Sequence, residues 1–217
     1  QSTLETQKTL VQMSGRGGIL NVDVLSFHRL AYRVFEEVPV LRKAVLEDMG
    51  KMMLLRKVLS EQKEELCYFK RGLYKPGFLD ECKSFLCELM QYAVKEEDFD
   101  TMERAVGGEG LMAWKIRDLR RIYHALKEKL GDTYMMAEEL VSQLTGVAAS
   151  IPMLRGSVIC LDGFTGFTPV QYELLGELLA CCDRMIVTVT TDRTGDRGMV
   201  FQMSTDTMNR LSKLAAA

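Results

Sequence analysis

Long apolar runs, paired cysteines and an excess of charge of one sign are all missing from this sequence of 217 residues. No uninterrupted apolar stretch approaches the roughly 20 residues that cross a bilayer, and the N-terminus has neither the basic nor the apolar region of a signal peptide. We therefore expect a cytoplasmic protein that makes no membrane contact. The formal net charge is -2, which excludes a chain-wide basic field of the kind that attracts nucleic acid.

The cysteines give no sign of a disulfide or metal framework. None of the six belongs to a C-x-x-C pair, and His28 and His124 are the only histidines. Cys82 and Cys87 are five residues apart, a spacing that puts them on different faces of a helix. We therefore expect reduced, packed thiols, with neither a metal site nor a bound cofactor in these residues.

The two ends and one missing motif indicate a piece of a longer protein. The sequence begins at Gln1 rather than at methionine, and it ends in three alanines. A phosphate-binding loop of the form G-x-x-x-x-G-K-[ST] does not occur in it, since Gly50-Lys51 is followed by methionine in a helical pattern. We expect further strands, and any such loop, to lie outside the 217 residues.

Three short segments have the patterns of strands, and helical patterns flank them. Leu20–Leu25 alternates apolar and polar residues, as a strand with one buried face does, whereas Val158–Leu161 and Met185–Val189 are apolar runs typical of buried parallel strands. Ser26 is placed to cap one helix and Pro169 to open another. The pattern predicts an α/β fold with a parallel sheet of about three strands.

The stretch between the first and second of these strands predicts helices alone. One amphipathic helix is expected at Pro76–Ala93 and another at Leu111–Leu130, where Gly131 ends it. Asp132 or Thr133 is placed to cap a further helix. No strand is expected in this stretch.

This arrangement predicts a discontinuous domain. Residues 1–45 and 151–217 are assigned to the α/β domain, which is incomplete, and residues 46–150 to an all-helical insertion. The insertion interrupts the sheet between its first and second strands.

One side of the helix at residues 111–130 is basic, through Arg117, Arg120, Arg121, Lys127 and Lys129. Because Asp118 and Glu128 interleave with these cations, a solvated face is favoured over a DNA-binding stripe. Trp114 on the same helix is assigned to core or helix-interface packing.

The most specific local pattern is the apolar strand that runs into Asp162 and Gly163. A buried parallel strand that ends in an aspartate has the form of a Walker B motif, in which the carboxylate holds Mg²⁺ beside nucleotide phosphates. The pattern is weak by itself, since many buried strands end in an aspartate at a turn. On this pattern alone both interpretations stay open.

The residues after this strand resemble superfamily 1 helicases. There the strand is followed by D-E-F-Q-D-T-x-x-x-Q-Y, and here residues 162–172 read D-G-F-T-G-F-T-P-V-Q-Y. Gly163 stands in place of the glutamate that activates water in those helicases, and glycine cannot act as a base. Past the next strand, Thr190-Thr191-Asp192 lacks the glutamine that senses the γ-phosphate there. The resemblance implies a partial P-loop, helicase-like fold without catalytic residues, with Asp162 as a relic of nucleotide and magnesium binding.

A second stretch carries the same resemblance. Ser26-Phe27-His28-Arg29-Leu30-Ala31 is similar to the T-F-H-x-L-A stretch that borders the single-stranded DNA path of these helicases. Ser26, Phe27 and His28 are therefore candidates for DNA binding, because a helix N-terminus suits a phosphate and a ring plane suits a base. A capped amphipathic helix with a surface histidine is the other interpretation.

The order of these motifs along the whole chain resembles the AddB family, the B subunit of the AddAB helicase–nuclease. The resemblance is carried by Gln1–Glu5, the run from Ser26, residues 50–57 and Leu161–Pro169, with D-G-F-x-x-F-T-P usual in the family. It implies an AddA-like partner subunit, contact with single-stranded DNA and duplex ends, and a role in double-strand-break repair and homologous recombination. It also implies ATP and magnesium in the whole protein, and an iron–sulfur cluster in a C-terminal nuclease domain beyond Ala217.

Three functions are consistent with the sequence. The first is a hydrolysis-deficient, helicase-like DNA-binding scaffold within that subunit. The second is a helical protein-interaction module that docks a partner subunit, whose signature is an apolar stripe left exposed after the helices pack. The third is a truncated active P-loop ATPase, which the glycine at position 163 disfavours.

Overall fold

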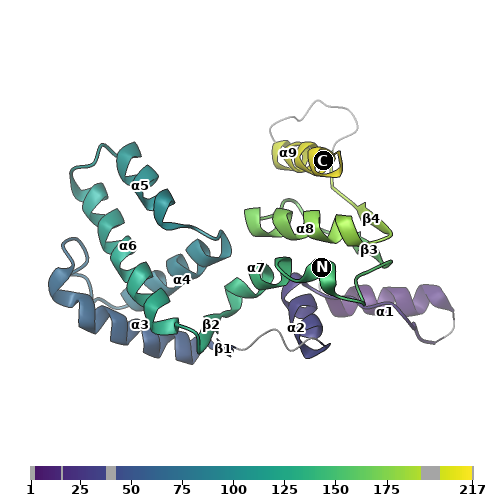
Figure 1. Cartoon of the computed structure of the whole chain (residues 1–217), viewed down its shortest axis with the longest axis horizontal. Coiled ribbons are helices and arrows are strands. Elements are labelled where there is room, and N and C mark those ends of the chain that lie inside the picture. The colour runs from purple at the N-terminus through teal and green to yellow at the C-terminus, as the bar shows by residue number, and fades with distance from the viewer. Residues whose placement is uncertain (1–2, 16, 38–42, 192–200, 217) are drawn as a thin grey trace. The chain divides into compact units, whose positions relative to one another are not determined.

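The chain is a mostly helical α/β protein with two small parallel sheets of two strands each (Figure 1). The computed structural model describes residues 3–15, 17–37, 43–191 and 201–216. The chain divides into two compact units, one formed by residues 1–39 and 140–217 and the other by residues 40–139. Within the described ranges, no helix combines the length and the apolar character needed to span a membrane.

The first unit, called here the split unit, is built around one β-α-β element. Strands β3 and β4 pair in parallel from Val158 opposite Arg184 to Leu161 opposite Val187, and helix α8 connects them. The elements of this unit are α1 (Thr3–Ser14), α2 (Phe27–Glu37), α7 (Leu140–Thr145), a 3-10 turn (Ala148–Ser150), β3 (Val158–Leu161), α8 (Pro169–Cys181), β4 (Arg184–Val187) and α9 (Gln202–Ala215).

Helix α8 is the centre of the split unit. Thr168 caps it, since its hydroxyl accepts the backbone N–H of Gln171 at 3.3 Å while the Gln171 side chain accepts the N–H of Thr168 at 2.9 Å. Pro169 occupies the first turn, where its missing N–H costs nothing. Helices α7 and α9 pack against α8 (Figure 1), and Leu174 and Leu175 of α8 are fully buried. The unit therefore has its own core.

The second unit, called here the helical unit, is closed by a short sheet. Strand β1 pairs in parallel with β2, from Ala44 opposite Tyr134 to Leu46 opposite Met136. The elements of this unit are β1 (Ala44–Leu46), α3 (Asp48–Gln62), a 3-10 turn (Lys63–Glu65), α4 (Phe78–Gln91), α5 (Glu96–Ala105), α6 (Leu111–Leu130), β2 (Tyr134–Met136) and a second 3-10 turn (Ala137–Glu139).

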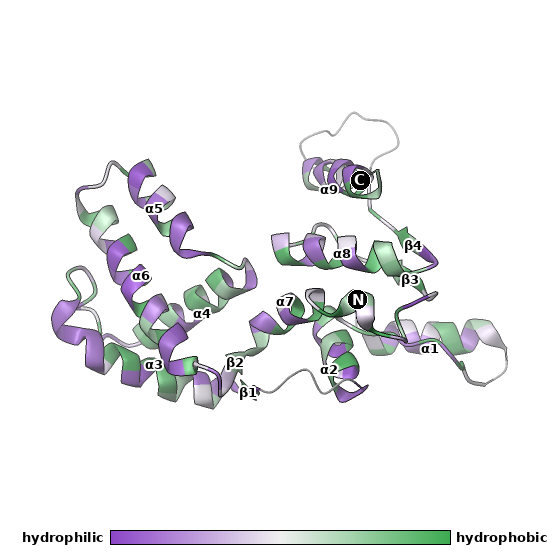
Figure 2. Cartoon of the chain, in the orientation of Figure 1, coloured by the Kyte–Doolittle hydropathy of each residue, from purple (hydrophilic) through white to green (hydrophobic). Residues whose placement is uncertain are grey.

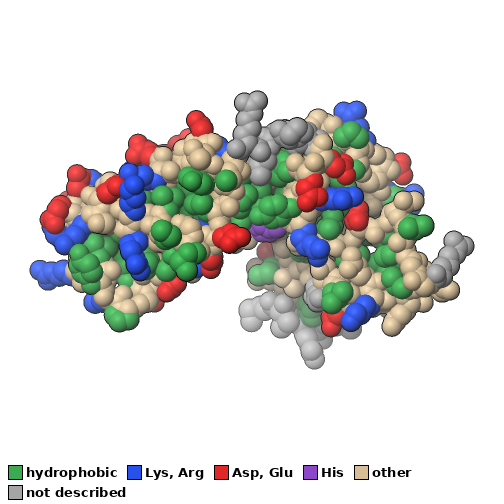
Figure 3. Space-filling view, turned by 90° about the horizontal axis from the view of Figure 1, so that it is seen from below, with side chains coloured by type: hydrophobic (Ala, Val, Ile, Leu, Met, Phe, Trp, Pro, Cys, Tyr) green, Lys and Arg blue, Asp and Glu red, His purple; other side chains and the backbone are tan. Residues whose placement is uncertain are grey.

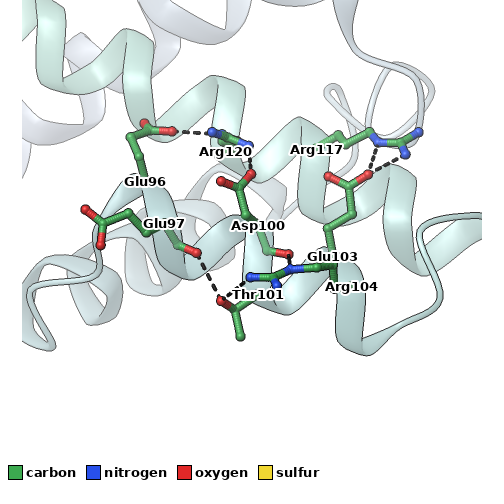
Figure 4. A network of polar contacts seen from close by, with 8 residues as sticks. All are labelled: Glu96, Glu97, Asp100, Thr101, Glu103, Arg104, Arg117 and Arg120. Carbon is green, nitrogen blue, oxygen red and sulfur yellow. Dashed lines mark hydrogen bonds and ion pairs between the residues drawn. The ribbon is translucent and has the colours of Figure 1, made fainter.

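Helix α6 supplies more buried residues to the core of the helical unit than any other helix of that unit. Its buried residues recur at helical spacing, so that apolar and polar colours alternate along the helix (Figure 2). Ile122 and Leu126 pack in one cluster with side chains of α3, α4 and α5, among them Phe99. On the polar side, Arg117 and Arg120 reach across to acidic residues of α5 (Figure 4). Apolar burial and these ion pairs together hold α5 against α6.

Several predicted elements are confirmed. The strand at Val158–Leu161 is present as predicted, and the next strand is found at Arg184–Val187, one residue earlier than its predicted start. The predicted helices at residues 76–93 and 111–130 correspond to α4 and α6, and Gly131 follows the second of them as its C-cap. Apolar periodicity over a dozen or more residues was sufficient to find these helices.

The predicted strand at Leu20–Leu25 is wrong. Residues 20–25 are described but form no strand; Leu20 is 90% exposed and Asn21 has a φ of 60°, which is outside the extended region. The α/β class and the parallel pairing of the second and third predicted strands are confirmed, but the strands among the described residues form two separate pairs and not one sheet of about three strands. A strand is stable only beside a hydrogen-bonded neighbour, and alternation in one sequence segment does not supply that neighbour.

The region expected to be wholly helical also contains a strand. Tyr134–Met136 forms β2, where the sequence predicted a helix capped by Asp132 or Thr133, and α7 starts only at Leu140. The N–H of Met136 is donated to the Glu139 carboxylate at 3.1 Å, which closes the turn between strand and helix.

Candidate site at the strand ends

The carboxyl ends of β3 and β4 bring Asp162 and Thr188 together. Each follows the last paired residue of its strand, since Leu161 lies opposite Val187. The Thr188 hydroxyl donates a hydrogen bond to the Asp162 carboxylate, and the Thr188 N–H donates to the carbonyl of Leu161 at 2.9 Å. In open α/β sheets, ligands bind outside this edge of the sheet. Here the aspartate is already engaged by a neighbouring side chain.

Gly163 follows the aspartate in a backbone conformation suited to glycine. Its φ is +77°, and apart from Gly163 and its two chain neighbours no atom of the described residues lies within 4 Å of the position that a Cβ would take. A side chain at this position would clash with none of these residues, but it is disfavoured because residues with a Cβ rarely adopt this positive φ. The backbone at this position favours glycine, and glycine offers no acid or base beside Asp162.

The loop after β3 is joined to the start of α2 by aromatic rings. Phe27, the first residue of α2, lies 5.5 Å from Phe164 and 6.2 Å from Phe167 between ring centroids, and these two rings stack at 5.0 Å. Phe27 is buried, with 7% of its surface exposed. Two stretches separated by more than a hundred residues in the sequence are thus held side by side, which brings together both of the sequence-predicted site regions.

Helix α9 holds the other side of this loop. The Thr207 hydroxyl donates to the backbone carbonyl of Thr165 at 3.3 Å, and Gly166 leaves room for the side chain of Met203. Thr207 is buried although it is polar, which its bond to the loop explains. The loop is consequently fixed from α2 and α9 together.

The N-terminus of α2 is the part of this region open to solvent. Ser26 is exposed and caps the helix by accepting the N–H of Arg29 at 3.3 Å, and His28 is half-buried. The first turn of a helix leaves N–H groups without an intrahelical acceptor and carries a partial positive charge. Together with the exposed side chain of Arg29, this end of α2 favours an anionic ligand.

At the described carboxyl ends of β3 and β4, Asp162 is the one carboxylate available to a magnesium ion. Mg²⁺ takes six oxygen ligands, commonly one or two carboxylates with substrate phosphates and water. Asp162 is a single carboxylate bonded to Thr188, and the sequence contains no phosphate-binding loop. Among the described residues, no group of three or more His, Cys, Asp or Glu side chains is arranged to hold a metal. Asp192, at the segment compared with the γ-phosphate sensor, lies outside the described residues.

The cysteines are reduced but only in part packed. All six are free, and Cys67 and Cys160 are exposed. Burial raises the pKa of the Cys82 thiol to about 12 and that of Cys87 to about 11, so neither is a thiolate near neutral pH. Both of these thiols belong to α4 of the helical unit.

The chain matches, over residues 1–217, the family described as ADDB, N-terminal. It belongs to the AddB family. Among its relatives is the ATP-dependent helicase/deoxyribonuclease B subunit of Lachnoclostridium phytofermentans, 40% identical over 220 residues, which covers 99% of this chain and 19% of the relative. The B subunit of Heliobacterium modesticaldum is 36% identical over 197 residues, covering 89% and 16%, and that of Moorella thermoacetica is 33% identical over 227 residues, covering 100% and 20%.

This AddB chain spans about a fifth of the length of the curated relatives that it matches. The resemblance seen in the sequence is thereby confirmed at the level of the family. What the sequence missed is the set of contacts around its motifs. Thr188 was not singled out, although a threonine after a strand next to an aspartate-ended strand is a usable signal, and Phe164 and Phe167 were not recognised as the partners of Phe27.

Proposed function

We propose that this chain is a hydrolysis-deficient, helicase-like DNA-binding scaffold in the B subunit of a bacterial helicase–nuclease that acts in double-strand-break repair and homologous recombination. The name that its relatives share supports the setting. The observation that carries the loss of hydrolysis is the strand-end aspartate, which is bonded to Thr188 and followed by Gly163 in a conformation that suits glycine. In this proposal Asp162 is a relic of a nucleotide and magnesium site.

The same proposal extends to the architecture of the whole protein. A parallel pair of four-residue strands is marginal by itself, and Val158 and Ile186 are 58% and 45% exposed on the pair. We propose that β3 and β4 belong to a larger helicase-type sheet, completed by other parts of the full-length subunit. The helical unit is then an insertion into that α/β domain.

The N-terminus of α2 is the proposed DNA contact. Ser26 and His28 lie at a helix end that favours phosphate. Phe27 was a candidate for stacking on a base, but its ring is buried against Phe164 and Phe167. Its part in the proposal is to fix the helix end beside the strand-end loop. An AddA-like subunit is the proposed partner in the assembled enzyme.

The DNA contact is tested by the affinity of the chain for fluorescein-labelled (dT)20, measured by fluorescence anisotropy at low salt. Replacing Ser26→Ala together with His28→Ala is expected to weaken binding about threefold to tenfold, because a helix cap and one polar contact to phosphate are lost. Ser142→Ala with His124→Ala removes the same two side-chain types elsewhere and serves as the matched control. Equal affinity of the two double variants would remove the support for this contact.

One observation favours docking of a partner subunit as a second candidate function. The hairpin between α5 and α6 exposes apolar side chains, with Leu111 67%, Met112 55% and Trp114 46% exposed. The sequence assigned Trp114 to packing within the protein, which its exposure contradicts. Large apolar side chains gathered at one exposed hairpin are typical of interaction surfaces. Leu111→Ser with Trp114→Ser is expected to weaken co-purification of the full-length subunit with its partner, whereas Tyr134→Ser is not.

A further inference from the structure

The loop between the first 3-10 turn of the helical unit and α4 has an unusual composition. Residues 66–77 read L-C-Y-F-K-R-G-L-Y-K-P-G, with three cations, three aromatic residues and no acidic residue. The whole chain is slightly acidic, at -2, and the face in Figure 3 shows lysines and arginines intermixed with acidic side chains. Longer acid-free stretches occur at residues 6–22 and 140–161, but neither contains more than two cations. Residues 66–77 differ in combining three cations and three aromatic residues with no acid.

The loop sorts its side chains into an inner and an outer set. Phe69 and Leu73 pack against the core of the helical unit, and the Phe69 ring lies 5.2 Å from that of Phe78. The residues between and after them, Lys70, Arg71, Tyr74 and Lys75, are exposed, and Tyr74 keeps 78% of its surface open. Because the two apolar anchors point inward, the basic and aromatic residues are left on the solvent side.

Asp118 fixes the backbone of this loop. Its buried carboxylate accepts three consecutive backbone N–H groups, from Cys67 at 3.0 Å, Tyr68 at 2.8 Å and Phe69 at 2.9 Å. Two turns follow, with the N–H of Gly72 donated to the carbonyl of Phe69 at 2.7 Å and that of Lys75 to Gly72 at 2.9 Å. A preorganised loop loses little conformational entropy when a ligand binds.

The cations of the loop differ from those of α6 in their partners. On α6 the side chains of Arg117, Arg120, Arg121, Lys127 and Lys129 are each paired with a carboxylate, as Figure 4 shows for the first two. In the loop, Lys70 is paired with Glu64, whereas within the described residues Arg71 and Lys75 have no acidic partner. Lys63 lies 5.3 Å from the centre of the Tyr74 ring and adds a third cation nearby. Two neighbouring cations of the loop are therefore unpaired, whereas five of the six lysines and arginines of α6 are paired and only Lys115 is not, among the described contacts.

We propose that residues 66–77, called here the basic loop, bind the phosphodiester backbone of single-stranded nucleic acid. Arg71 and Lys75 contact phosphates, and Tyr74 stacks on an unpaired base with the ring face that Lys63 leaves open. Unpaired cations beside an exposed ring on a fixed backbone are the recurring features of single-strand binding surfaces. The inference extends the proposed DNA-binding role, on which it rests, to the helical unit and to residues other than those at α2.

The test uses the complete chain with three probes in fluorescence anisotropy at about 50 mM salt: labelled (dT)20, a labelled 20-base-pair duplex, and unlabelled poly-glutamate as competitor. Arg71→Gln with Lys75→Gln is expected to weaken (dT)20 binding at least about tenfold and to lower the salt slope by about 1.4, as expected for two lost phosphate contacts. Lys127→Gln with Lys129→Gln removes the same charge from α6 and is expected to change affinity less than twofold.

The aromatic residue is tested separately. Tyr74→Ala is expected to weaken (dT)20 binding at least about fivefold, since a stacked base is lost, and to leave duplex binding within about twofold. Tyr134→Ala removes an exposed tyrosine from β2 and is the control.

Each other outcome contradicts a defined part of the inference. If Arg71→Gln with Lys75→Gln and Lys127→Gln with Lys129→Gln lose the same affinity for (dT)20, binding depends on the overall charge of the chain and the basic loop is not a specific site. Competition by poly-glutamate as strong as that by unlabelled (dT)20 would identify a surface for acidic proteins instead. If the loop variants bind (dT)20 normally while Ser26→Ala with His28→Ala binds it weakly, the basic loop is not a binding site and the proposed contact at α2 stands. If the loop variants bind weakly while Ser26→Ala with His28→Ala binds normally, the basic loop stands and the contact at α2 fails. No binding of (dT)20 by the unaltered chain overturns both.

Discussion

Replacing Asp118 by asparagine should destabilise the helical unit with almost no change in shape. The carboxylate accepts the N–H of Cys67 at Oδ1 and the N–H groups of Tyr68 and Phe69 at Oδ2. The side-chain oxygen of an asparagine can still accept the N–H groups of Tyr68 and Phe69 if it takes the place of Oδ2. Its NH₂ group then takes the place of Oδ1 and faces the N–H of Cys67. One donor is left unsatisfied, and the two remaining bonds lose their charge assistance.

The expected cost follows from these contacts. An unsatisfied buried donor costs about 1–3 kcal/mol, and weakening the other two bonds brings the total to roughly 2–4 kcal/mol. With a urea m-value of about 2 kcal/mol/M, in the range typical of small domains, the unfolding midpoint should fall by roughly 1–2 M. Asp118→Ala, which removes all three acceptor bonds, should be at least as destabilising.

The assay is specific for the helical unit because the chain has a single tryptophan, Trp114, on α6 beside Asp118. Tryptophan fluorescence during urea unfolding therefore follows this unit. Glu128→Gln, which makes the same chemical change at an exposed position of α6, should alter the stability by less than about 0.5 kcal/mol. If the urea midpoint of Asp118→Asn differs from that of the unaltered chain by no more than the midpoint of Glu128→Gln does, the role given to Asp118 is refuted.

Three further predictions concern other buried groups. Phe27→Ala should destabilise the split unit by about 3–5 kcal/mol and speed hydrogen exchange in the loop after β3; unchanged exchange there would contradict the aromatic link between α2 and that loop. Burial raises the pKa of Tyr123 to about 12, above its ordinary value, so the neutral phenol favours the folded state; the stability that it contributes is complete below pH 10 and is lost as the pH rises from about 10 to 12. The urea midpoint, followed by tryptophan fluorescence, should therefore fall more between pH 10 and 12 in the unaltered chain than in Tyr123→Phe. Equal falls in the two proteins would contradict a contribution from the buried phenol. Iodoacetamide at pH 8 should modify the exposed Cys67 and Cys160 well before Cys82, whose pKa burial raises to about 12; mass spectrometry of the peptides checks the order, and early modification of Cys82 would argue against its burial.

Helical elements were predictable because their evidence is local and repeated. Periodicity over twenty residues located α6, and Pro169 located the start of α8. Ser26 was predicted to cap α2, and its hydroxyl accepts the N–H of Arg29. In each case the residues that determine the structure lie within one or two helical turns of one another.

Strand pairing was less predictable because the partner lies far away in the sequence. Strand β1 pairs with a segment about ninety residues further on, and three-residue strands are too short to show a period of two. Leu20–Leu25 has the period but lacks a partner strand in the described structure, and Leu20 is 90% exposed there.

The candidate site residues were singled out from the sequence, but their contacts were not. The sequence identified Asp162 and the start of α2 as regions of interest, and the structure joins them through the ring of Phe27. It did not indicate that Thr188 bonds to Asp162, since that contact depends on the register of β3 and β4. The basic face of α6 was correctly interpreted as solvated, because its cations are paired with carboxylates.

The proposed loss of hydrolysis at the strand-end aspartate is tested most directly by ATP turnover of the full-length AddB protein, purified without other subunits and supplied with single-stranded DNA. We expect Asp162→Ala to leave the rate unchanged within error, because Asp162 is bonded to Thr188 and the residue beside it is glycine. If the unaltered protein hydrolyses ATP above background and Asp162→Ala abolishes that activity, this unit is a working motor and the account is wrong.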